Sequence, residues 1–161
     1  MKGRIFYIIV MLLSAILIFA GGATNSHANT VYDGSASLDI VITDIINVTL
    51  GVPAAPGDIF INAFADSDPP DFFANGPAFA SAFSDANQFP LPPPPVLGPG
   101  DGISLLATAS GNTFGPASDA FSVADAFGVF FLENLTADDH EVFFEVTTSQ
   151  IGNASVCRYA D

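Results

Sequence analysis

The sequence predicts an all-β protein, an antiparallel β-sandwich of about seven or more strands preceded by a signal-peptide helix. Three observations predict this fold class. Apolar residues after residue 30 recur at every second position, which places them on one face of a pleated strand. Clusters of Gly, Pro, Asn and Asp separate these stretches, as turns do in sandwiches. The 16 Phe and the 50% of hydrophobic residues are enough to build a core.

The first 28 residues have the order of a secretory signal peptide. Lys2 and Arg4 precede the apolar run Ile5–Ala20, and small and polar residues follow it. This run is shorter than the roughly 20 apolar residues that span a bilayer. We therefore expect cleavage after Ala28 and a single secreted, periplasmic or cell-surface domain of residues 29–161. The alternative is an uncleaved signal anchor that tethers the domain outside the cell.

The domain that remains after cleavage is strongly acidic. Arg158 is its one basic residue apart from histidine, against 17 acidic residues, which gives a formal charge of −16. This charge repels phosphate backbones and anionic lipids, so we expect no nucleic acid partner and membrane contact only through an uncleaved amino-terminal segment. Divalent cations and basic surfaces are attracted instead. Cys157 stands alone and cannot form an internal disulfide, and the oligomeric state stays open.

The expected strands follow one another along the domain. The first apolar alternation covers Leu38–Leu50, and Asp44 interrupts it with a turn or a bulge. Further strands are expected over Asp58–Asp66, Pro77–Ala86, Ile103–Ser110, Ala117–Leu132 and Glu141–Thr148. In the longest of these one face is apolar and bulky, with Phe121, Val123, Phe127, Val129 and Phe131. Its other face carries the small residues Ala120, Ser122, Ala124, Ala126 and Gly128, which either approach a neighbouring sheet closely or lie open to solvent.

Turn-forming residues separate these strands. Gly and Pro predict turns over 51–57, 66–71, 98–102 and 111–116. The segment 89–99, FPLPPPPVLGP, has too many prolines for a central strand. We expect it to form a polyproline II crossing between the two halves of the domain.

The domain is poor in catalytic residue types. It contains no Lys, and His140 is its only histidine. A catalytic triad built on His140 with Asp138 or Asp139 lacks the Gly-x-Ser-x-Gly turn that presents a serine nucleophile. Zinc is not expected, because one His and one distant Cys are fewer than the three or four N/S ligands of such a site. We therefore expect a protein that is not an enzyme. The remaining enzymatic alternative is a glycoside hydrolase with an Asp/Glu pair about 5 to 10 Å apart.

One acidic loop is a candidate calcium site. Asp66, Asp68 and Asp71 lie close together in the sequence around Pro69 and Pro70. Carboxylate oxygens on a turn are ligands that Ca²⁺ prefers. The central Gly and the closing Glu of an EF-hand loop are absent, and the alternative is a solvated acidic loop. No other cofactor is expected.

The whole domain, and especially FFLENLTADDHEVFFEVTTS at residues 130–149, resembles the β-sandwich region of exported bacterial proteins sorted by the exosortase, or PEP-CTERM, system. Those proteins join a signal peptide to a domain that is low in Lys and rich in Ala, Ser, Asp and Phe. The resemblance implies a role at the envelope or in extracellular matrix, with polysaccharide or matrix proteins as partners. Such proteins close with a Pro-Glu-Pro motif, a membrane helix and a basic tail. This chain closes with Arg158–Asp161 instead, so we expect an unanchored relative or a truncated carboxyl terminus.

Overall fold

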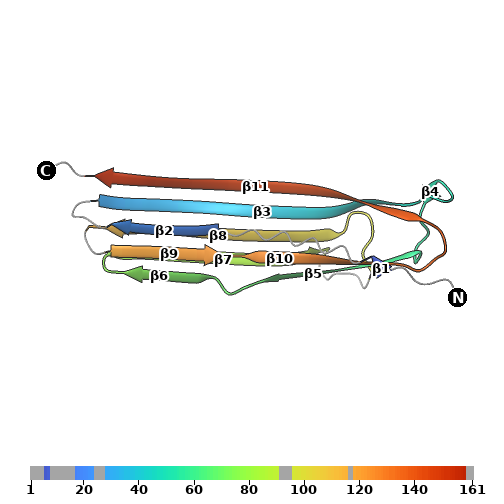
Figure 1. The fold of residues 1–161 in the computed structure, drawn as a ribbon, viewed down its shortest axis with the longest axis horizontal. Helices are drawn as coiled ribbons and strands as arrows, with labels where there is room; N and C mark the ends of the chain where they lie inside the picture. Colours follow the sequence, from blue (N-terminus) through green and yellow to red (C-terminus); the bar gives the residue numbers. More distant parts are fainter. Residues whose placement is uncertain (1–5, 8–16, 24–27, 91–95, 116–117, 159–161) are drawn as a thin grey trace.

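The computed structural model describes residues 6–7, 17–23, 28–90, 96–115 and 118–158, and side chains within 29–155 (Figure 1). All regular structure in these ranges is β-strand. Every strand pair in them is antiparallel. The all-β, antiparallel fold predicted from the alternating pattern is therefore confirmed. Among the same residues no helix is long and apolar enough to cross a membrane.

The largest sheet has five strands and contains the longest ones. Its order is β11-β3-β8-β7, and the short β4 pairs with the end of β3. The strands are β3 (Ala28–Asn47), β4 (Val52–Pro53), β7 (Ala78–Phe89), β8 (Gly102–Phe114) and β11 (His140–Arg158). β11, β3 and β8 lie side by side along the long axis of the molecule (Figure 1).

Two three-stranded sheets complete the fold. One has the order β1-β10-β5 and the other β2-β9-β6. The strands are β1 (Phe6–Tyr7), β2 (Leu17–Ala23), β5 (Ile59–Ser67), β6 (Asp71–Asn75), β9 (Ser118–Ala124) and β10 (Ala126–Asn134). Only Asp125 separates β9 from β10, and β6 follows β5 after three residues. The two sheets therefore continue one another end to end (Figure 1).

The hydrophobic core lies between the five-stranded sheet and the sheet of β10 and β5. β3 and β8 contribute Leu38, Ile40, Ile42, Ile103 and Leu105, and β5 and β10 contribute Ile59, Ile61, Ala63, Ala126 and Phe130. Leu97, from the connection between β7 and β8, completes this cluster. Its N–H donates to the carbonyl of Ile61 at 2.8 Å. At about 25 cal/mol per Å² of apolar surface, burial of these side chains is the main source of stability.

The small face of β9 and β10 is the face that packs inward. Ala120, Ser122, Ala124 and Ala126 are at most 2% exposed. A Cβ on Gly128 would lie 2.2 Å from Cδ1 of Ile103 on β8. Ser122 Oγ lies 3.3 Å from the Tyr32 hydroxyl on β3 and donates to the Ser110 carbonyl on β8 at 3.2 Å. Small side chains let the sheets approach closely, so the small face lies inside rather than open to solvent.

Several strands are longer than the alternation predicts. Asp44 marks a bulge within β3 rather than a turn, because the pairing with β11 shifts there and leaves one residue out. β8 continues to Phe114, although a turn was expected from Gly111. A Cβ on Gly111 would lie 2.4 Å from the Tyr32 hydroxyl, so this glycine makes room for the tyrosine. The turn comes at Gly115, where φ is +73°.

The expected proline-rich crossing differs from the structure, and the expected signal helix stays a prediction. The proline-rich segment links β7 to β8, which are paired neighbours in one sheet, rather than two halves of the domain; residues 91–95 lie outside the described residues. A helix was expected over residues 1–28. The described parts, β1 and β2, run as strands beside β10 and β9, where the open edge of those strands offers unpaired backbone groups. The rest of that segment, and with it the signal helix, lies outside the described residues.

Candidate functional site

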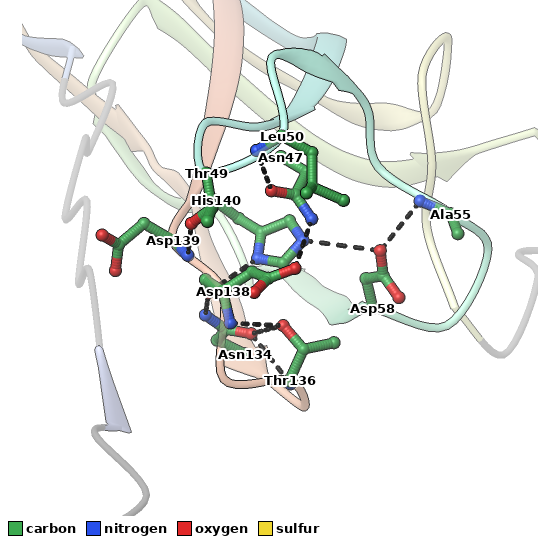
Figure 2. A network of polar contacts seen from close by, with 10 residues as sticks. All are labelled: Asn47, Thr49, Leu50, Ala55, Asp58, Asn134, Thr136, Asp138, Asp139 and His140. Carbon is green, nitrogen blue, oxygen red and sulfur yellow. Dashed lines mark hydrogen bonds and ion pairs between the residues drawn. The ribbon is translucent and has the colours of Figure 1, made fainter.

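A polar cluster joins three turns at one end of the sheets (Figure 2). The last residue of β10 is Asn134, the turn from β10 to β11 supplies Thr136, Asp138 and Asp139, and β11 begins with His140. The end of β3 and the turn after it supply Asn47 and Thr49, and the connection from β4 to β5 supplies Asp58. Asp, Asn and Thr occur in such turns because their short side chains bond to nearby backbone groups.

The buried amide of Asn47 holds the first two turns together. Its Nδ2 donates to Asp138 Oδ2 at 2.9 Å, and its Oδ1 accepts from the N–H of Leu50 at 3.0 Å. The Asp139 N–H donates to Thr49 Oγ1 at 2.9 Å. Because the bonds from Asn47 to Asp138 and from Asp139 to Thr49 connect residues about 90 positions apart, they fix the end of β3 against the turn from β10 to β11.

The imidazole of His140 links the turn from β10 to β11 with the connection from β4 to β5. Its side chain is 1% exposed, and its Nδ1 lies 3.1 Å from the carbonyl oxygen of Asp138. A carbonyl only accepts, so Nδ1 carries the hydrogen. Nε2 has no hydrogen-bond partner and lies 3.5 Å from Asp58 Oδ2.

We predict measurable energetic coupling between His140 and Asp58. In a double-mutant cycle of His140→Ala and Asp58→Ala, the interaction term in the free energy of unfolding is expected to be ~1 kcal/mol, within the 0.5 to 3 typical of contacting residues. Urea denaturation of the four proteins measures it. The control cycle pairs His140→Ala with Asp33→Ala, near the other end of β3, and should be additive. Coupling that is equal in both cycles would contradict a specific contact.

A cavity of about 240 Å³ adjoins the cluster. Its walls are the apolar side chains of Ile59, Leu132, Val142 and Phe144 and the polar residues Asn134, Asp139 and His140. The polar neighbours of the His140 ring are the carboxylate of Asp58 and the backbone carbonyl of Asp138. The arrangement is thus a buried histidine, held by turns, beside a mainly apolar cavity.

A second, wider groove of about 490 Å³ lies beside the connection from β4 to β5. Prolines and alanines line much of it, and Asp44 and Asp101 contribute the two carboxylates of its wall. Each of these carboxylates accepts a backbone N–H at 2.8 Å, from Ile45 and from Gly98 respectively. Asp44 thus holds the bulge in β3 and Asp101 the connection from β7 to β8, and both carboxylates lie in a mainly apolar groove.

The three aspartates of the candidate calcium loop lie in different elements. Asp66 is in β5, Asp68 is in the connection and Asp71 is the first residue of β6. Asp66 Oδ1 accepts from the Ser67 N–H at 2.8 Å. Within the described ranges, no three His, Cys, Asp or Glu residues are grouped so that they could hold a metal ion. The structure does not bring these carboxylates together as ligands, and the calcium site stays a prediction.

The second candidate site is a sheet surface that is rich in phenylalanine. Since the small face of β9 and β10 packs inward, the alternate residues of these strands point away from the core. Residues that are directly paired across two strands share a face. The register with β5 and β6 therefore places six phenylalanines on this outer surface, here called the aromatic face: Phe60, Phe64, Phe73, Phe121, Phe127 and Phe131.

The aromatic face is open to solvent over much of its area. Phe64, Phe73 and Phe131 are 47%, 56% and 46% exposed. The rings of Phe64 and Phe127 are 6.1 Å apart between centroids, so the side chains pack on one another along the sheet. Exposed aromatic side chains gathered on one face are typical of interaction sites.

Carboxylates share the aromatic face with the phenylalanines. The register pairs Asp66 with Phe127, Glu133 with Phe60 and Asp71 with Val123. Asp119 lies on the same face, paired with Asn75. The surface thus combines exposed aromatic rings with negative charge.

Comparisons with protein families, curated proteins and solved structures found no match for this chain. The site assignment therefore rests on geometry. Sequence reasoning identified the bulky face of residues 121–131 but left open whether it lies inside. It did not find the contact between Asp58 and His140, because no local pattern links residues 82 positions apart.

Proposed function

We propose that this chain is an exported, noncatalytic β-sandwich protein of the cell surface or extracellular matrix that acts by binding a partner through its aromatic face. The observation that carries the proposal is the outward position of these phenylalanines: the six rings lie opposite the face that packs on the five-stranded sheet. Exposed apolar surface gains free energy when a partner covers it.

The sequence supports the export part of this proposal. The segment 1–28 has the order of a signal peptide, and the composition resembles exported exosortase-sorted proteins. The expected product starts at Asn29 and is found outside the cytoplasm. Recovery of chains that still begin with Met1 in the membrane fraction would instead favour the alternative, a surface protein tethered by an uncleaved anchor.

The binding part is tested by pull-down of the purified protein with envelope polysaccharide and matrix extracts. The native protein is expected to be retained, and Phe64→Ser/Phe131→Ser is expected to lose at least about tenfold in retention, since exposed aromatic anchors dominate such contacts. The matched control is Phe79→Ser/Phe83→Ser, which removes two phenylalanines of similar exposure, 56% and 51%, from β7. Failure of the native protein to bind any extract, or equal losses in both variants, would refute binding through this face.

A second candidate function, glycoside hydrolysis, is favoured by one observation only. Asp44 and Asp101 both line the wider groove, as a catalytic carboxylate pair would. Release of reducing sugar from envelope polysaccharide that disappears in Asp44→Asn would favour this enzyme over a binding protein.

A further inference from the structure

The charge around the aromatic face restricts what can cover it. The four carboxylates Asp66, Asp71, Asp119 and Glu133 lie among the phenylalanines. The domain has no Lys, and its single Arg lies near the end of β11. No basic side chain is therefore available on β5, β6, β9 or β10 to neutralise these carboxylates.

This charge disfavours several occupants. A second copy of the mature chain would bring another formal charge of −16 to the interface, with like charges facing each other. Anionic lipid and anionic polysaccharide meet the same repulsion. A neutral polysaccharide would stack on the rings but would leave the negative field uncompensated. A cationic, apolar polypeptide satisfies both features, because its Lys and Arg reach the carboxylates and its apolar side chains cover the rings.

We propose, resting on binding through the aromatic face, that the partner is a cationic polypeptide segment with apolar side chains. Its apolar residues pack on Phe64, Phe127 and Phe131, and its Lys or Arg side chains pair with Asp66 and Glu133, each of which is opposite a phenylalanine across the sheet. Arg side chains gain further from these rings through cation–π contact. A purely basic peptide would lack the apolar contacts with the rings, and a purely apolar peptide would leave the carboxylates unpaired. The proposed partner therefore has both kinds of side chain.

The test uses three synthetic peptides of equal length as probes. One is an amphipathic peptide of Leu and Lys, the second replaces Leu by Ser and keeps the charge, and the third replaces Lys by Glu. Calorimetric titration of the purified protein should detect only the Leu/Lys peptide as a tight ligand. Its affinity should fall about tenfold between low salt and about 0.5 M salt, because the charges on the face are screened.

Variants locate the binding on the protein. Phe64→Ser/Phe131→Ser and Asp66→Asn/Glu133→Gln should each raise the Kd of the Leu/Lys peptide at least about tenfold, as loss of interface anchors does. The control Phe79→Ser/Phe83→Ser on β7 leaves the net charge of the native protein unchanged. It should change the Kd of the Leu/Lys peptide less than about twofold. Thermal unfolding of each variant confirms that it is folded before the titration.

Four outcomes would overturn the inference. These are equal affinity for the Ser/Lys peptide, tight binding of the Leu/Glu peptide, equal losses in the β7 variant, and a dimer in sedimentation that Phe64→Ser/Phe131→Ser abolishes, which would identify a second copy as the occupant. If matrix extracts are retained through the aromatic face but no Leu/Lys peptide binds, the proposed function stands and only the cationic partner is wrong. If neither binds, both proposals fall.

Discussion

Replacing Gly102 by alanine is expected to lower the free energy of unfolding by ~3 kcal/mol or more, at the upper end of the cost of inserting a methyl group into a packed core. A Cβ at this position would lie 2.0 Å from the carbonyl oxygen of Ile40 and 2.9 Å from Cζ of Phe89. The first of these atoms belongs to the backbone of β3, in the centre of the five-stranded sheet. It cannot move aside as the end of a side chain can, so β3 and β8 would have to separate.

The control for this prediction is Gly98→Ala in the connection from β7 to β8. No heavy atom lies within 4 Å of a Cβ built there, and the backbone φ is not positive. This variant should change the free energy of unfolding by less than about 0.5 kcal/mol, because the added methyl group meets no neighbouring atom. Urea denaturation of the two variants and the native protein measures the difference. Similar stabilities of Gly102→Ala and Gly98→Ala would contradict the close approach of β3 and β8.

The alternation of side chains predicts strands because it is a local property of the backbone. Leu38, Ile40 and Ile42 alternate with polar or smaller residues, and all three lie in the core as expected. Turn chemistry predicted the break between β5 and β6 in the same way. Strand ends were predicted less well, because the Ser, Ala and Gly residues at 34–37 carry little apolar signal. Their pairing with β8 and β11 extends β3 well beyond the predicted start.

The sites depend on contacts that no local pattern encodes. The turn at 136–141 could be predicted from its Asp residues, but the position of His140 against Asp58 follows from the pairing of β11 with β3 and of β10 with β5. The same limit applies to the aromatic face. Alternation separates Phe127 from Ala126, but it does not tell which of the two faces the core. Hydrophobicity alone would place the phenylalanine inside, where the structure has the alanine.

Because the small side chains of β10 face the core, the second large loss of stability is expected from a substitution at Ala126. This side chain is 0% exposed and belongs to the core cluster between the sheets. Ala126→Leu is expected to lower the free energy of unfolding by ~3 kcal/mol, because three additional carbon atoms enter a packed interior and force side chains or strands apart. Urea denaturation measures the loss.

The matched control places the same new side chain on the opposite face. Asn62 lies on β5, is exposed and pairs with Phe131 on the aromatic face, so Asn62→Leu adds apolar surface where solvent has room for it. Its free energy of unfolding should stay within about 1 kcal/mol of the native protein. If the measured stabilities were the reverse, with Ala126→Leu tolerated and Asn62→Leu strongly destabilised, the result would mean that the phenylalanines face the core. The aromatic face would then be no binding surface, because the rings assigned to a partner would already be covered by the protein itself.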